Sequence, residues 1–175
     1  MNEKAAGVTN SGTYSNIDEI VADLQELRLA SQSVRYKGSA TPELPSKDAI
    51  RTITDALISV LYPRHFGPTG LSAEKIVEYQ RSTLINALGR LQKQILLELG
   101  LTAAVDAVIQ LDVGRKAVQI SNELAANFPR IRSLLDSDIL AAYHGDPAAK
   151  SIDEIVFCYP GIAATIRHRI AHQIY

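Results

Sequence analysis

The chain has 175 residues, 46% of them apolar and 21% charged, with 18 basic and 19 acidic side chains and a formal net charge of −1. A chain of this length can bury a core within one domain, and the balanced charge argues against nucleic-acid or membrane-surface partners held by bulk charge. The single cysteine, Cys158, excludes an intrachain disulfide, and no signal peptide or long apolar run is found, so a cytoplasmic protein is predicted.

The first 45 residues are predicted to form a disordered tail (1–15) and an N-terminal helix with a linker (16–45). The tail is rich in Gly, Ser, Thr and Asn and has hardly any large apolar residue. Apolar residues at helical spacing from Ile17 to Leu27 predict the helix, which is expected to end near Ser33. The sequence leaves open whether this helix packs on its own domain or on another subunit.

Residues 46–175 are predicted to form one helical domain. Ser46 and Ser72 each precede an apolar stripe of helical period, as N-cap residues do, and Pro63 is expected to end the first of these helices before a loop. The second is the longest and is expected to run from about residue 73 to 99, with Gly100 just past its end.

Two further helices are predicted over residues 102–126 and 129–143, separated by a break at Pro129. The dominance of Ala, Leu and Ile favours helix packing, and no alternating strand pattern of useful length is found. The predicted fold class is therefore all-α, a multi-helix bundle.

The segment from Gly145 to the C-terminus concentrates helix starts and stops. Gly145 is expected to end a helix in the left-handed conformation, with Asp146 capping the next helix and Pro147 in its first turn. Ser151 and Glu154 have the spacing of a capping box. A last helix follows a Pro-Gly break, with an isoleucine every fourth residue, and the chain is expected to stop within it. These isoleucines are Ile162, Ile166, Ile170 and Ile174.

Several residues of this region invite a chemical role, and each has a simpler interpretation. His168 and His172 share a helix face at a spacing that suits two metal ligands, but no third ligand is evident, so a basic contact face and no metal site are expected. Cys158 is expected to be a buried structural thiol, and the acidic pair Asp136 and Asp138 to lie on a solvated helix face. No phosphate-binding loop, CxxC or GxSxG motif is found, so the residues alone give a helical domain and no chemistry.

A resemblance adds what the residues alone do not. Four strings near the C-terminus resemble the N-terminal helical domain of serine O-acetyltransferases: DILAAY from Asp138, GDPAAKS from Gly145, CYPGI from Cys158 and RIAH from Arg169. Upstream strings are similar to the bacterial branch with a longer N-terminal extension: LPS from Leu44, LYP from Leu61, HFG from His65 and FPRIR from Phe128. The resemblance covers about Leu44 to Tyr175.

The resemblance implies transfer of acetyl from acetyl-CoA, the co-substrate, to the hydroxyl of serine. It implies that Asp146, with Pro147 beside it, reaches the serine pocket and meets the substrate ammonium, and that cysteine inhibits by occupying this pocket. It also implies a homo-oligomer built through the helical domain, and O-acetylserine sulfhydrylase as a partner of the full-length enzyme through its C-terminal tail.

The general base, a histidine oriented by an aspartate, and the acetyl-CoA groove belong to a left-handed β-helix in these enzymes. That domain needs hexapeptide repeats, which this sequence lacks, so it would follow Tyr175. We therefore expect a fragment with no catalytic residue and no bound cofactor, inactive by itself. The alternative is a stand-alone helical interaction module without an enzymatic parent, which would expose an apolar patch to a partner.

Overall fold

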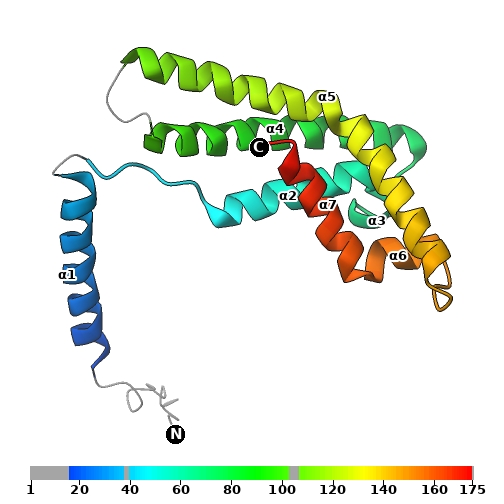
Figure 1. Cartoon of the computed structure of the whole chain (residues 1–175), viewed down its shortest axis with the longest axis horizontal. Coiled ribbons are helices and arrows are strands. Elements are labelled where there is room, and N and C mark those ends of the chain that lie inside the picture. The colour runs from blue at the N-terminus through cyan, green and yellow to red at the C-terminus, as the bar shows by residue number, and fades with distance from the viewer. Residues whose placement is uncertain (1–15, 38–39, 103–106, 175) are drawn as a thin grey trace, which may run out of the picture. The chain divides into compact units, whose positions relative to one another are not determined.

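The computed structural model describes residues 16–37, 40–102 and 107–174, which form seven helices and no strand (Figure 1). The predicted all-α class is confirmed. The chain divides between Pro42 and Glu43 into two units, which are described separately. Residues 1–15, predicted to be disordered, lie outside the described ranges. None of the described helices is long and apolar enough to cross a membrane.

The first unit contains α1 (Ile17–Tyr36), which extends three residues beyond the predicted end at Ser33. Its first turn carries Asp18 and Glu19, where the helix dipole favours acidic groups. Lys37 ends the helix in the left-handed region, with φ of 47°. No residue of α1 is buried.

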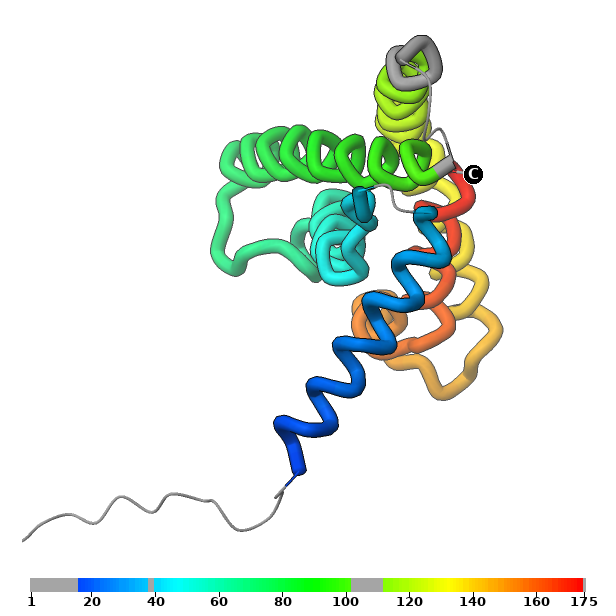
Figure 2. The backbone as a smooth tube through the Cα atoms, turned by 90° about the vertical axis from the view of Figure 1, so that its left-hand side faces the viewer, coloured from blue at the N-terminus to red at the C-terminus, as the bar shows by residue number. Residues whose placement is uncertain are grey.

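The second unit is a bundle built on α2 (Lys47–Leu61), α4 (Ala73–Thr102) and α5 (Ala107–Gly145). α2 packs along α4 and α4 along α5, as the two views show (Figures 1 and 2). Ser46 caps α2 by accepting a hydrogen bond from the Ala49 amide at 3.2 Å, and Ser72 caps α4 through Lys75 at 3.4 Å, as predicted. The two longest helices, α4 and α5, both end two or three residues later than their apolar patterns indicated.

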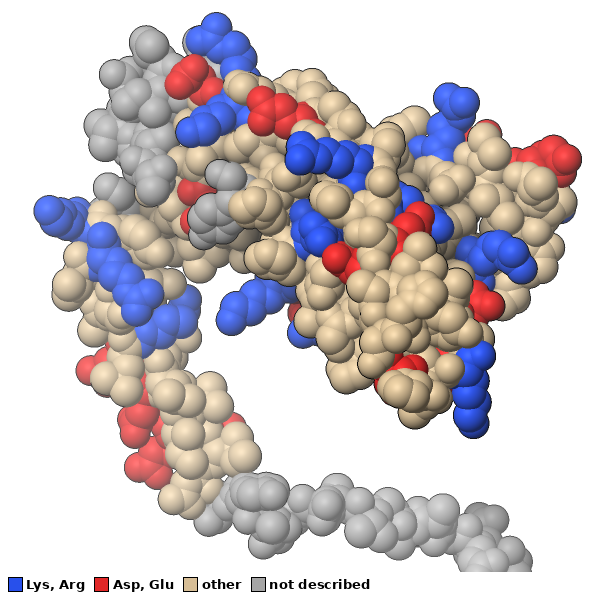
Figure 3. Space-filling model, turned by 45° about the vertical axis from the view of Figure 1, so that its right-hand side comes forward, with Lys and Arg blue, Asp and Glu red and all other residues tan. Residues whose placement is uncertain are grey.

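The core is formed by apolar side chains at helical spacing on each of these helices. Fully buried members lie on α2, α5, α6 (Ile152–Cys158) and α7 (Pro160–His172), which closes the bundle. The largest are Ile53, Leu57, Leu124, Leu135, Ile155 and Ile166. The isoleucine stripe of α7 is confirmed, since Ile162, Ile166 and Ile170 are buried. The charged side chains of the bundle stay outside, with both signs interspersed over the face in Figure 3.

Three predicted helix boundaries are wrong. α4 continues through Gly100 to Thr102, and Pro63 begins a single-turn helix, α3 (Pro63–Phe66), where a loop was expected. α5 runs unbroken through Pro129, although proline removes one helical hydrogen bond. Leu124 and Phe128 before the proline, and Ile131 and Leu135 after it, are buried, so α5 packs on the core on both sides of Pro129.

The chain end also differs from its prediction. α7 ends at His172, and the next two residues form a turn in which the Gln173 and Ile174 amides donate to the carbonyls of Ile170 and Ala171 at 3.2 and 3.0 Å. The described part of the chain therefore does not stop within a helix. The last turn tightens to shorter-range hydrogen bonds, as helix ends commonly do.

Candidate functional site

The corner between α5 and α6, residues 145–151, holds the two predicted site residues. α5 ends at Gly145, whose φ is not positive, so the left-handed ending predicted there is wrong. The Ala149 amide donates to the Asp146 carbonyl at 3.1 Å, which closes a four-residue turn with Pro147 at its second position. Proline suits that position because its ring fixes φ near the value the turn needs.

Asp146 does not cap a helix, contrary to the prediction. α6 begins six residues later, at Ile152, and its cap is Ser151, whose hydroxyl accepts from the Glu154 amide at 3.0 Å. The Glu154 carboxylate reaches back to the Lys150 amide at 2.8 Å, one residue further than a standard capping box. Ser151 and Glu154 therefore cap α6, and the Asp146 side chain is available for other contacts.

The Asp146 carboxylate joins the corner to the start of α7. Its Oδ2 atom accepts a hydrogen bond from the Tyr159 hydroxyl at 2.5 Å, and its Oδ1 atom accepts one from the Ala148 amide at 2.9 Å. Tyr159 precedes Pro160, the first residue of α7. Tyr159 was not predicted as a site residue, since the only signal in the sequence is a tyrosine beside a helix start. Pro147 is exposed, and its contribution is the backbone turn.

These contacts keep Asp146 ionised. The Tyr159 hydrogen bond, followed by that of the Ala148 amide, holds the pKa of the Asp146 carboxyl below its ordinary value. The same hydrogen bond raises the pKa of Tyr159 to about 12. Among the ion pairs of the described residues, none involves Asp146. Each carboxylate oxygen can accept more than one hydrogen bond, so the corner presents an uncompensated negative charge able to receive an ammonium group.

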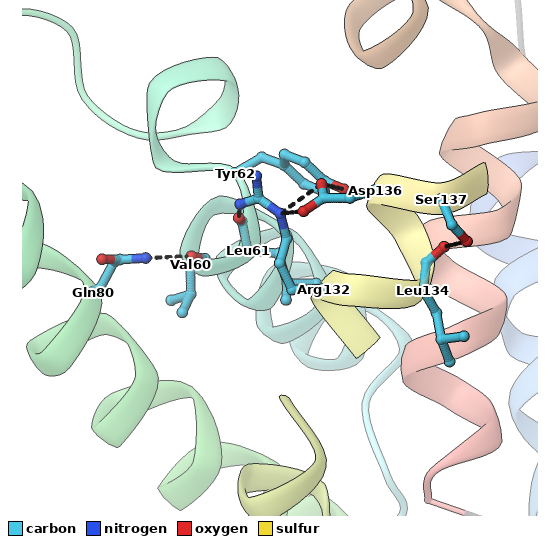
Figure 4. Close-up of polar contacts among 8 residues, drawn as sticks. All are labelled: Val60, Leu61, Tyr62, Gln80, Arg132, Leu134, Asp136 and Ser137. Atoms are coloured by element: carbon cyan, nitrogen blue, oxygen red, sulfur yellow. Dashed lines mark hydrogen bonds and ion pairs between the residues drawn. The ribbon is translucent and has the colours of Figure 1, made fainter. Parts of the chain in front are cut away.

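A second carboxylate–tyrosine pair lies where α2 meets α5 (Figure 4). Asp136 accepts from the Tyr62 hydroxyl at 3.1 Å and from Arg132 Nε at 2.8 and 3.0 Å. The Arg132 guanidinium also donates to the Leu61 carbonyl at the end of α2 and lies 4.1 Å from the centre of the Tyr62 ring. Burial, and then the Asp136 charge, raise the pKa of Tyr62 above its ordinary range.

The acidic residues that were expected to be solvated are thus structural. Asp138 receives two hydrogen bonds from Arg169, from Nε at 2.6 Å and Nη2 at 2.8 Å, which tie α5 to α7. Cys158 is exposed, so its prediction as a buried thiol is wrong. His168 and His172 stack with ring centroids 5.9 Å apart, and the described residues contain no group of three side chains that could hold a metal.

The corner and the C-terminal end of α7 lie apart. Tyr159 stands at the start of α7 and His172 at its end, 13 helical residues later. At 1.5 Å per residue the separation is roughly 20 Å. Both backbone views place the corner and the C-terminal residues of α7 at opposite ends of this helix (Figures 1 and 2). The C-terminal end of α7 therefore lies about one helix length from Tyr159, the partner of Asp146.

Comparison with known proteins gives consistent names. A protein from Synechococcus elongatus named "Serine acetyltransferase, plasmid" is 44% identical over 135 residues, covering 75% of this chain and 42% of that protein. Proteins named serine acetyltransferase from Mycobacterium tuberculosis and Synechocystis are 50% and 42% identical over 38 and 41 residues. These cover 22% and 23% of this chain, and 17% and 16% of those proteins. No family model matches the chain.

The fold places the described ranges in the class of all-α helical domains, consistent with the N-terminal helical domain that the sequence strings imply. The resemblance to the serine acetyltransferases is confirmed by curated relatives of that name. The chain spans less than half the length of these relatives.

Proposed function

We propose that this chain is the helical part of a serine O-acetyltransferase, and that Asp146 contributes to its serine site. The observation that carries the proposal is the ionised Asp146 carboxylate, which Tyr159 holds at the corner and which forms no ion pair within the described ranges. An α-amino acid brings an ammonium group that such a carboxylate binds through charge-assisted hydrogen bonds. The relatives' name supplies the reaction.

In that reaction the serine hydroxyl oxygen forms a bond to the acetyl carbonyl carbon while the thioester bond breaks. A general base removes the hydroxyl proton, and coenzyme A leaves as the thiol. Asp146 binds and orients the amino acid, and the turn at Pro147 fixes where the carboxylate points. The base and the acetyl-CoA site are assigned to sequence beyond Tyr175, so this chain by itself is expected to be inactive. No cofactor is assigned to it.

The further parts of the proposal concern assembly and place in the cell. We assign self-association to the helical bundle, where the half-exposed rings of Phe66 and Phe157 lie 5.8 Å apart and form an apolar surface. Binding of O-acetylserine sulfhydrylase through a C-terminal tail, and a cytoplasmic location, belong to the longer protein. Neither nucleic acid nor a membrane is proposed as a partner.

The decisive experiment uses the longer protein that contains this chain. Asp146→Asn removes the charge but keeps the shape, so the KM for serine should rise by about tenfold or more, as expected for losing a hydrogen bond to a charged group. Inhibition by cysteine should weaken in parallel, with the KM for acetyl-CoA unchanged. Asp153→Asn is the matched control, since this exposed carboxylate contacts His65 instead. If Asp146→Asn alters neither serine binding nor cysteine inhibition, the assigned role is wrong.

Two simpler observations separate this proposal from a stand-alone interaction module. Hexapeptide repeats encoded directly after Tyr175 favour the acetyltransferase, whereas a stop codon there favours the module. The purified 175-residue chain should form no O-acetylserine from serine and acetyl-CoA. Production of O-acetylserine by that chain would contradict the assignment of the catalytic groups to later sequence.

A further inference from the structure

One face of α1 carries apolar residues at alternating spacings of three and four. Such spacing is that of the a and d positions of a heptad, which line the seam of a coiled coil. With Ile17 at a, the a and d positions over two and a half heptads are Ile17, Ile20, Leu24, Leu27, Ser31 and Val34. We call these six residues the α1 seam.

The α1 seam is solvent-exposed along its apolar length. Leu24 and Leu27 are 60% and 67% exposed, and no residue of the helix is buried. An isolated helix of 20 residues gains little from propensity alone, because most helical stability comes from packing an apolar face. The seam therefore has the surface of a helix that completes its packing against another helix.

We propose that α1 associates with α1 of other copies of this chain as a parallel coiled coil. This inference deepens the self-association part of the proposed function by naming a second surface for it, and it does not depend on acetyl transfer. The seam residues indicate more than two strands. Isoleucine at both a and d, as at Ile17 and Ile20, favours three or four helices, and Val21 at the flanking e position widens the apolar stripe.

The charges beside the seam favour the parallel orientation. In parallel helices a g residue faces the e residue of the next heptad in its neighbour, which pairs Asp23 with Arg28 of another copy. In antiparallel helices the e positions face each other, so Arg28 and Arg35 of one copy would lie opposite the same arginines of another and repel them. Figure 3 shows acidic side chains toward one end of α1 and basic ones toward the other. The other acidic residues, Asp18, Glu19 and Glu26, occupy b and c positions, away from the seam.

The first test is cross-linking in the full chain with Cys158→Ser, since the native cysteine is exposed. Leu27→Cys places a thiol at a d position, where identical residues meet in a parallel coiled coil, and should form disulfide-linked dimers on mild oxidation. Leu29→Cys is the matched control, because Leu29 is 53% exposed on the same helix but lies off the seam. Equal cross-linking at both positions, or none at Leu27→Cys, would overturn the proposal.

The second test measures association by analytical ultracentrifugation. Leu24→Glu with Leu27→Glu should remove the α1-dependent association, whereas Leu29→Glu should leave it intact. Asp23→Arg or Arg28→Asp alone should weaken association at least about threefold, because each turns an attractive exposed pair into a repulsive one. The double variant D23R/R28D should restore it.

Two outcomes would contradict the parallel coiled coil. A chain that stays monomeric at every concentration, and whose bundle unfolds more easily with Leu27→Glu, would mean that α1 packs within its own chain. Failure of the double charge swap to restore association would exclude the parallel register. Loss of acetyl transfer has no bearing on either outcome, so the inference and the proposed function fail separately.

Discussion

Two aspartate–tyrosine hydrogen bonds in the described part of the chain differ in what else the aspartate binds. At the joint between α2 and α5, Asp136 binds Tyr62 and also the guanidinium of Arg132. At the corner between α5 and α6, Asp146 binds Tyr159 and a backbone amide but, among the described residues, no cation. We call these the joint and the corner.

The difference separates a structural carboxylate from a candidate binding one. At the joint, the charges of Asp136 and Arg132 neutralise each other in an ion pair. Arg132 also caps the end of α2 by donating a hydrogen bond to the Leu61 carbonyl. At the corner, no cation among the described side chains pairs with the negative charge of Asp146. We therefore expect changes at the joint to act on stability, and changes at the corner to act on ligand binding.

The largest expected effect is that of Arg132→Met. It leaves Asp136 without its cation and removes the donor to the Leu61 carbonyl. Both side chains of the ion pair are nearly half exposed, so we expect a loss of about 2 kcal/mol in the free energy of unfolding, from the hydrogen bond, the screened ion pair and the cation–π contact together. Urea unfolding followed by circular dichroism measures it.

Arg130→Met is the control for this prediction, because Arg130 lies exposed on the same helix two residues away. It should change the free energy of unfolding by less than about 0.5 kcal/mol. Equal losses in the two variants would show that the joint adds nothing specific.

The next effect in size is that of Ser151→Ala at the corner. This change removes the acceptor of the Glu154 amide and should cost about 1 kcal/mol, the usual value for an N-cap. Ser151→Asp, which can cap a helix, should recover most of the loss in the same unfolding assay. If Ser151→Ala leaves the free energy of unfolding unchanged, α6 is held by its buried side chains alone.

A smaller effect on unfolding is expected for Asp146→Asn. The asparagine oxygen can still accept from the Ala148 amide, and its NH2 group can donate to the Tyr159 hydroxyl oxygen instead of accepting from it. The urea midpoint should therefore shift less than it does for Ser151→Ala. If the same change in the longer protein strongly raises the KM for serine, Asp146 acts on ligand binding and Asp136 on stability. A midpoint shift as large as that of Arg132→Met would make Asp146 a structural residue like Asp136.

The helices themselves could be predicted from the sequence because their signals are local. A serine cap followed by apolar residues at helical spacing located the starts of α2 and α4, and the isoleucine stripe located the buried face of α7. The break predicted at Pro129 did not occur, since the buried residues on both sides outweigh one lost hydrogen bond. Local signals therefore located these helices, but they also predicted starts at Pro129 and after Asp146 that do not occur.

The side-chain contacts of the site could not be predicted in the same way. Arg169 and Asp138 are 31 positions apart, and Tyr62 and Asp136 are 74 positions apart, so each pair meets only once the helices have packed. Tyr159 is only 13 residues from Asp146, but a whole helix, α6, lies between them. The resemblance pointed to Asp146, and the structure adds the tyrosine that orients it.

The smallest expected effect is the pH dependence of the corner. The pKa of Tyr159 is raised from 10.0 to about 12 in the folded chain, so its contribution to stability is complete below pH 10 and is lost as the pH rises toward 12. The pKa of Asp146 is lowered from 3.8, so its contribution is present above that pH and is lost as the pH falls through the lowered value. Between these limits the contribution of the pair should be constant.

Tyr159→Phe isolates this contribution, because the variant keeps the ring and loses the hydroxyl. The difference in urea midpoint between the native chain and Tyr159→Phe should stay level from about pH 5 to 9 and shrink outside that range, at both ends. The pKa of Tyr62 is raised in both proteins, so the contribution of Tyr62 to the pH dependence cancels in the difference. A difference that does not change with pH would show that the Asp146–Tyr159 hydrogen bond does not hold the corner, and that the carboxylate is oriented by its backbone turn alone.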